Sequence, residues 1–167
     1  MRYFYDCEFI EDGTLITLVS IGVVDETGRE YYAVSTEFDP ERAIDWVRRN
    51  VLNQLPGPAS PVWKSRARIR DELLEFLLAP GEPIELWAWM ASYDHVVLAQ
   101  LWGDMRALPR QLPRFTHELR QFWEQAGSPP LPPAGPDAHD ALADARHNLA
   151  RWQVINHART GADRLPT

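Results

Sequence analysis

Two carboxylates near the amino terminus are the first residues whose type and spacing could do chemistry. Asp6 and Glu8 lie two positions apart in an aromatic and apolar run, which is typical of a strand. Because side chains alternate along a strand, both carboxylates leave the same face. A hard divalent cation would offset their charge, since Mg²⁺ and Mn²⁺ prefer carboxylate oxygen. The pair alone is equally compatible with an exposed edge strand whose acids face water.

A third acid, Asp94, follows an apolar run and falls in the first turn of a predicted helix over residues 92–102. We expect Ser92 to be the N-cap of this helix. An Asp in a first turn often only complements the helix dipole. Sites of open α/β sheets, however, form at the ends of strands, and Asp94 stands at such a position.

His139 and Asp144 open the longest helical pattern, residues 139–158. Five positions on a regular helix separate two side chains by about 140°, so the two converge more easily if His139 lies in the entry segment before the helix. A base on such a segment, beside a fixed metal ligand, is chemically sensible. The alternative is a solvent-facing stripe of helix-spaced ion pairs made by Asp140, Asp144, His147 and Arg151. This segment alone leaves both interpretations open.

The elements that must position these residues predict an α/β fold. Strands are expected at residues 2–9, 14–24, 30–36, 83–89 and 112–116. Helices are expected at residues 41–52, 65–79, 92–102 and 139–158, and one more helix is expected to follow the last strand and end at residue 125. Short turns between the first three strands indicate an antiparallel meander. We expect this meander to join parallel strands in one mixed central sheet flanked by helices. Residues 1–167 then form a single domain, with a Pro-rich loop at 128–138 and a C-terminal tail at 159–167.

Composition narrows the function classes. The net charge of −7 argues against binding nucleic acid mainly by phosphate neutralisation, although a site of several carboxylates is acidic by construction. Arginines cluster at residues 66–70 and 106–120, as a solvated face or a nucleic-acid track. The single cysteine, Cys7, excludes internal disulfides and cysteine-based zinc clusters, indicates a cytoplasmic protein, and is expected in the core. No apolar run is long enough for a membrane span, and Asp6 comes too early for a signal peptide.

Taken together, the motifs resemble those of the DEDDh 3′→5′ exonucleases. Phe4-Tyr5-Asp6-Cys7-Glu8-Phe9 is similar to the first motif of that family, and Tyr93-Asp94-His95-Val96-Val97-Leu98 to the second. The segment from His139 to Ala145, with Asp144 and its small alanines, is similar to the third. Five residues in this order are far more specific than any one of them, and the resemblance covers residues 4 to about 152.

The resemblance implies an RNase H-like sheet and two Mg²⁺ or Mn²⁺ ions per active site. It implies four metal ligands, Asp6, Glu8, Asp94 and Asp144, with Asp6 bridging both ions. Glu8 and Asp144 would complete the tighter site, and Asp94 would hold the second ion through water. His139 would deprotonate the attacking water, so that a 5′-nucleotide leaves from a free 3′ end.

Within this family the short layout is similar to the bacterial ribonuclease AS group, which implies single-stranded RNA as substrate, adenylate preference and a homodimer. Two places depart from the usual motifs, which carry Thr after the first-motif Glu and Asn before the second-motif Asp. This chain has Phe9 and the stretch Trp89-Met90-Ala91 there. A different set of contacts with the 3′-terminal nucleotide is therefore expected. The candidate substrate-binding residues are Glu8, Phe9, Trp89 and His139. Phe9 and Trp89 either stack on bases or belong to the core.

Three other functions would use some of the same residues. A DNA exonuclease uses all five, and tolerance of the 2′-hydroxyl, which no motif reports, would separate it from an exoribonuclease. A nucleic-acid-binding module that has lost turnover is disfavoured by the presence of the complete set. An RNase H-like endonuclease would need the carboxylates but not His139.

Overall fold

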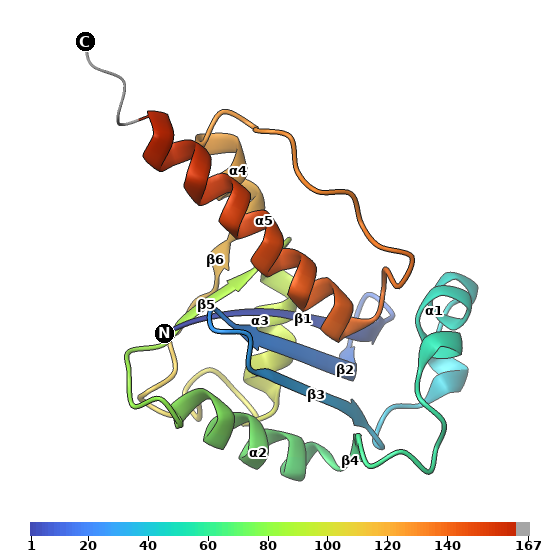
Figure 1. The fold of residues 1–167 in the computed structure, drawn as a ribbon. Helices are drawn as coiled ribbons and strands as arrows, with labels where there is room; N and C mark the ends of the chain where they lie inside the picture. Colours follow the sequence, from blue (N-terminus) through green and yellow to red (C-terminus); the bar gives the residue numbers. More distant parts are fainter. Residues whose placement is uncertain (163–167) are drawn as a thin grey trace.

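A six-stranded mixed sheet forms the middle of the computed structural model, which describes residues 1–162 (Figure 1). Its strands are β1 (Arg2–Glu11), β2 (Ile16–Asp25), β3 (Glu30–Ser35), β4 (Trp63–Lys64), β5 (Glu85–Ala88) and β6 (His117–Glu118), in the order β4-β3-β2-β1-β5-β6. The first three strands pair antiparallel. Strand β5 pairs parallel to β1, β6 parallel to β5, and β4 parallel to β3. The predicted meander joined by parallel strands is confirmed.

Helices pack on both faces of this sheet (Figure 1). On one face lie α2 (Arg66–Leu78) and α3 (Ser92–Gln100), and on the other α4 (Leu119–Gln125) and α5 (Ala141–Ala162). Strand β1 contributes side chains to the hydrophobic cores on both faces of the sheet. Tyr3, Tyr5 and Cys7 pack on the face of α2 and α3, and Phe4 packs on the face of α4 and α5. By the same alternation, the side chains of Asp6 and Glu8 point to the α5 face. The expectation that Cys7 is buried in the core is confirmed.

The predicted helix over residues 41–52 is wrong as a single element. The chain forms a 3₁₀ turn at Pro40–Arg42, helix α1 (Asp45–Asn50) and a second 3₁₀ turn at Leu52–Gln54. The interruption falls at Ala43 and Ile44, whose backbones are extended. Ala43 is buried in a small third cluster with Ile10, Val19 and Val51. Tertiary burial of this alanine therefore overrides the helical composition around it.

Three other boundaries differ from the prediction. Helix α3 has Ala91 at its N-cap, without a side-chain cap, so Ser92 is not the cap. The strand expected at 112–116 is displaced to β6, where the two residues pair with Trp87 and Ala88. Helix α5 begins at Ala141 and continues to Ala162, which takes up the start of the expected tail; residues 163–167 lie outside the described part.

The Pro-rich segment after α4 has no regular structure, as predicted. In Figure 1 this segment, drawn in orange, leads from the end of α4 to the start of α5, which lies near α1. Gln54 secures this segment, because its Nε2 donates a hydrogen bond to the Ala138 carbonyl at 2.9 Å. Within residues 1–162, none of the helices has both the length and the apolar character needed to cross a bilayer.

Candidate active site

A cleft of about 510 Å³ opens where the middle of β1 meets the starts of α3 and α5 and the side of α1. The five residues predicted for catalysis all line it: Asp6, Glu8, Asp94, His139 and Asp144. The two aromatic candidates for substrate binding, Phe9 and Trp89, line it as well. The tertiary structure therefore brings together residues from three distant parts of the chain.

The first two carboxylates lie under the start of α5 because β2 offers a glycine there. Asp6 is paired across the sheet with Gly22. A Cβ atom built on Gly22 would lie 2.3 Å from the carbonyl oxygen of Ala141, the first residue of α5. Only a residue without a side chain lets the helix start approach so closely. Gly22 thus places the beginning of α5 over Asp6, a role that no sequence motif indicates.

Asp94 is fixed by contacts on two sides. Its Oδ1 accepts a hydrogen bond from the backbone N–H of Cys7 at 2.8 Å, which ties the first turn of α3 to β1. The turn that precedes α3 contains Met90 at a φ of 60°, a rare conformation for a residue with a side chain. The carboxylate of Glu118 stabilises this turn by accepting the N–H groups of Met90 and Ala91 at 2.9 and 2.8 Å. Glu118 was missed from sequence, because its partners are 27 and 28 residues away.

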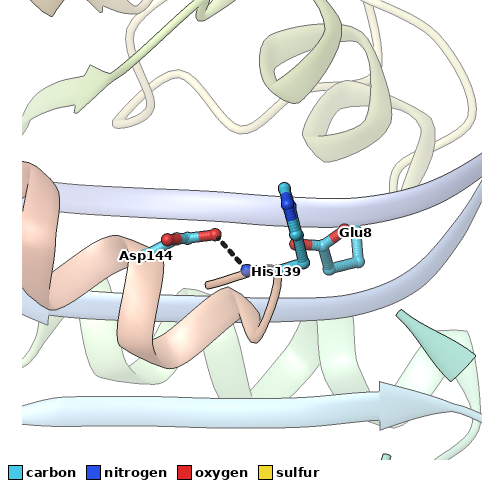
Figure 2. A group of neighbouring side chains, drawn as sticks. All are labelled: Glu8, His139 and Asp144. Carbon is cyan, nitrogen blue, oxygen red and sulfur yellow. Dashed lines mark hydrogen bonds between the residues drawn. The ribbon is translucent and has the colours of Figure 1, made fainter. Parts of the chain in front are cut away.

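His139 lies just before α5, in the entry segment that its spacing from Asp144 favours. Its backbone adopts a φ of 72°, and its N–H donates to Oδ2 of Asp144 at 2.9 Å (Figure 2). Figure 2 shows Glu8, His139 and Asp144 gathered at this point, and their potential ligand atoms all lie within 4.8 Å of one another. The imidazole also meets Trp46 of α1 edge-on, with ring centroids 4.8 Å apart.

The alternative of a solvent-facing stripe on this helix is wrong. Asp140 caps α5 by accepting the N–H groups of Leu142 and Ala143, and Asp144 turns into the cleft. His147 lies 3.0 Å from the Pro132 carbonyl, and Arg151 lines the cleft. All four side chains are only partly exposed, because the sheet and the Pro-rich segment cover part of this helix face.

Burial and mutual repulsion dominate the electrostatics of the cleft. Burial, followed by the charges of Asp144 and Asp94, raises the pKa of Glu8 to about 8. Burial raises the pKa of Asp94 to about 7, against the effect of its backbone hydrogen bonds. Burial and then the charges of Asp94 and Glu8 raise the pKa of Asp6 well above its ordinary range. The carboxylates are thus gathered at a cost that a bound cation would relieve.

This donor set fits divalent metal ions. Oxygen ligands from several carboxylates, with one imidazole at the edge, are the chemistry that Mg²⁺ and Mn²⁺ select. Four carboxylates line the cleft, Asp6, Glu8, Asp94 and Asp144, and we call them its floor. The ligand atoms of Glu8 and Asp144, together with those of His139, lie close enough to hold one ion. Burial raises the pKa values of Asp6, Glu8 and Asp94, and such a cluster of perturbed carboxylates in a cleft is typical of a functional site.

Apolar and aromatic side chains surround this floor. The rim consists of Ile44, Trp46, Met90 and Tyr93, which are 61, 49, 62 and 51% exposed. Phe9 stacks on Tyr93 with ring planes 6° apart and packs partly against the core. Trp89 is also half-buried and lies under the guanidinium of Arg151. Each of these two candidates therefore combines a core contact with a position on the cleft.

The sheet and its flanking helices form an RNase H-like fold. The structure titled S. pombe Pop2p, in its Mg²⁺- and Mn²⁺-bound form, superimposes with a TM-score of 0.52 and 12% sequence identity. The match covers 93% of this chain and 82% of Pop2p. At this identity the likeness concerns the fold.

Sequence similarity identifies the family. Residues 1–156 match the 3′-5′ exoribonuclease Rv2179c-like domain. Two proteins of Mycobacterium tuberculosis, the 3′-5′ exoribonucleases MT2234.1 (strain CDC 1551 / Oshkosh) and Rv2179c (strain ATCC 25618 / H37Rv), are each 64% identical to it over 156 residues. The alignments cover 93% of this chain and 93% of each relative. The chain belongs to the Rv2179c-like family of 3′-5′ exoribonucleases.

Proposed function

We propose that this protein removes 5′-nucleotides one at a time from the 3′ end of single-stranded RNA, using two Mg²⁺ or Mn²⁺ ions. The observation that carries the proposal is the convergence of His139 with four carboxylates in one cleft of a chain from a 3′-5′ exoribonuclease family. An endonuclease of the same fold would not need the histidine. The proposal takes residues 1–167 as one exonuclease domain.

In this proposal the floor residues Asp6, Glu8, Asp94 and Asp144 hold the ions. When bound, the ions make water more acidic and stabilise the negative charge that develops on the phosphate oxygens. The chain supports these ligands itself, because backbone N–H groups of Cys7 and His139 fix the carboxylates of Asp94 and Asp144. Removal of any one floor residue should impair the reaction, and removal of Asp94 or Asp144 should also destabilise the fold, because a backbone N–H group loses its acceptor.

His139 acts as the general base that accepts a proton from the attacking water. Its position supports this role, since the imidazole lies among the ligand atoms of Glu8 and Asp144 and outside the regular part of α5. Trp46 packs against the ring and limits its rotation. A general base placed in this way typically accelerates a reaction by about 10²–10⁴-fold.

In this proposal the 3′-terminal nucleotide lies against the aromatic side chains of the cleft. Its contacts are Glu8, Phe9, Trp89 and His139. Stacking on Phe9 or Trp89 would replace the sugar contacts of the usual motifs, at about 1–3 kcal/mol per stacked base. Adenylate preference, a homodimer and a cytoplasmic location complete the proposal. They rest on the resemblance to the ribonuclease AS group and, for location, on the single cysteine.

The test is a degradation assay with Mg²⁺ or Mn²⁺ and 5′-labelled oligo(A), oligo(U), mixed-sequence RNA and DNA. Wild type, Asp6→Asn and His139→Ala are compared, with a chelator as the metal control. Stepwise shortening of RNA that is lost with the chelator and in both variants is the expected result. Internal cuts that persist in His139→Ala would contradict an exonuclease, and equal rates on all RNAs would remove the adenylate preference. Faster shortening of DNA would favour the alternative DNA exonuclease.

A further inference from the structure

Arg151, a cation of the cleft, has no part in the function proposed so far. It lies on α5 and lines the cleft together with Asp6 and Asp144. Its guanidinium lies 4.3 Å from the ring centroid of Trp89. Burial lowers the pKa of Arg151, and the charges of Asp144 and Asp6 oppose that shift. Partial burial of the Arg151 cation costs free energy, and the nearby carboxylates of Asp144 and Asp6 offset part of that cost.

A buried neighbour holds this arginine in place. Nη1 of Arg151 donates to Oδ1 of Asn148 at 3.0 Å. Asn148 is 1% exposed, and its Nδ2 donates to the carbonyl of Tyr5 on β1 at 3.1 Å. The guanidinium is thus anchored through Asn148 to the strand that carries Asp6, and it lies over the ring of Trp89. Both contacts fix its direction before any ligand arrives.

Most of the hydrogen-bonding capacity of Arg151 remains free. A guanidinium has five N–H donors, and within residues 1–162 only the bond to Asn148 engages the side chain. It makes no direct ion pair with a carboxylate of the described chain, although Asp6 and Asp144 are near. The unused donors suit a planar or tetrahedral anion, and phosphate is the anion that an RNA strand brings into this cleft.

We infer that Arg151 is a substrate-binding residue that donates hydrogen bonds to a backbone phosphate of the RNA. The inference rests on the proposed function and extends it, because it gives the acidic cleft a cationic contact supplied by the chain itself. Metal ions would neutralise the floor carboxylates, and Arg151 would then be left without a competing anion. A contact of this kind is made to phosphate and not to a base, so it should act on every RNA sequence alike.

The competing explanation is that Arg151 is only an internal counter-ion for the floor. The two explanations differ in what they predict for RNA. A counter-ion would support the metal-free protein and leave RNA affinity unchanged. A phosphate contact would change RNA affinity and its dependence on salt concentration, because each neutralised phosphate releases counter-ions.

The test measures binding of a 5′-fluorescein-labelled single-stranded oligoadenylate and an oligouridylate in Mg²⁺ at several salt concentrations. The His139→Ala background slows turnover, so that anisotropy reports binding. Arg151→Gln is compared with Arg120→Gln, a matched control. Arg120 also lies over Trp89, at 5.9 Å, but pairs with Glu124 and does not line the cleft. Wild type and both variants are also assayed for kcat and KM without the background substitution.

We expect Arg151→Gln to weaken binding of both RNAs by about 10- to 100-fold, the range for a hydrogen bond to a charged group. The slope of log K against log salt should fall by about 0.7, the value for one contact with a single strand. KM should rise more than kcat falls, and Arg120→Gln should resemble wild type. Arg151→Lys keeps the positive charge but lacks the planar set of guanidinium N–H donors. It should therefore keep the salt dependence of binding and bind RNA several-fold more weakly.

Two results would overturn the inference while leaving the enzyme assignment intact. In the first, the wild type is active, and Arg151→Gln and Arg120→Gln bind RNA with the same affinity and the same salt dependence. In the second, the metal-free melting temperature of Arg151→Gln falls while its affinity for RNA does not change. Should Arg151→Gln not fold, a wild-type affinity for Arg151→Lys would count against the inference. Wild type that does not shorten RNA at all would contradict the proposed function instead.

Discussion

The floor and the rim of the cleft differ in how their side chains are held. Floor carboxylates are buried or half-buried, and Asp94 and Asp144 accept backbone N–H groups at 2.8 and 2.9 Å. The rim residues Trp46 and Tyr93 are about half exposed and are held mainly by ring contacts. The chain thus fixes the groups that would hold ions and leaves the groups that would meet a base open to solvent. Such a division suits an enzyme that needs one geometry for chemistry and tolerance for successive nucleotides.

The strongest test of the floor is Asp6→Asn, which replaces a carboxylate opposite Gly22 with a neutral amide. We expect kcat to fall by about a thousandfold or more, since metal ions supply several kcal/mol of transition-state stabilisation. The melting temperature in chelator should be unchanged or higher, because the variant removes repulsion with Asp94 and Glu8. Nuclease rates and thermal melts check both expectations. Near-wild-type turnover would show that the floor is not the catalytic centre.

The support under the floor is tested by Gly22→Ala. The added Cβ would lie 2.3 Å from the Ala141 carbonyl, so α5 must shift away from Asp6. We expect a loss of about 3 kcal/mol in the free energy of unfolding, together with at least a tenfold loss of kcat. Gly57→Ala is the matched control, because nothing lies within 4 Å of the Cβ position there. Denaturant unfolding should separate the two variants; equal stability would mean that the helix start adapts freely.

The link between rim and floor is tested at Trp46. We expect Trp46→Ala to lower kcat by about three- to tenfold, the size of one aromatic contact, because the His139 ring loses its neighbour. Trp46→Phe should restore most of the rate, since an aromatic ring remains. If Trp46 served only to stack on RNA, KM would rise and kcat would stay constant. Steady-state kinetics on one RNA distinguishes the two cases.

The smallest expected effect is a pH dependence of stability that is caused by titration of the floor carboxylates. The pKa values of Glu8 and Asp94, raised to about 8 and 7, mean that these groups favour folding when protonated. Their contribution is present below about pH 4, the range of the unfolded carboxyls, and is lost as the pH rises through 7 to 8. In chelator, the melting temperature should therefore be lower at pH 8 than at pH 6, by roughly 5 °C.

Glu8→Gln should flatten this pH profile, and Trp46→Ala on the rim should leave its slope unchanged. Added Mg²⁺ should raise the melting temperature more at pH 8 than at pH 6, because protons and ions compete for the same oxygens. Differential scanning calorimetry or fluorimetry checks this. A profile that is the same in wild type and Glu8→Gln would mean that the floor does not control stability in this range.

Local pattern was sufficient for the parts of the molecule that repeat at short range. The alternation in β1 predicted that Asp6 and Glu8 share a face and that Cys7 is buried. Short turns predicted the antiparallel meander, and proline and glycine marked the loops. The five-residue spacing of His139 and Asp144 indicated that the two converge more easily if the histidine precedes the helix, and His139 does precede α5, with a φ of 72°. In each case the pattern that carried the prediction lies within a few residues along the chain, although the strands it pairs are farther apart.

The sequence by itself determined the sheet class, and the resemblance of its motifs to those of the DEDDh exonucleases pointed to the floor residues. Only the tertiary structure decided how they meet. Gly22 admits the start of α5, Glu118 holds the turn before Asp94, and Arg151 reaches the cleft through Asn148. These contacts join residues from distant segments, and their energy depends on close approach in three dimensions. No periodicity along the chain encodes such an approach, because it arises only when the helices pack on the completed sheet.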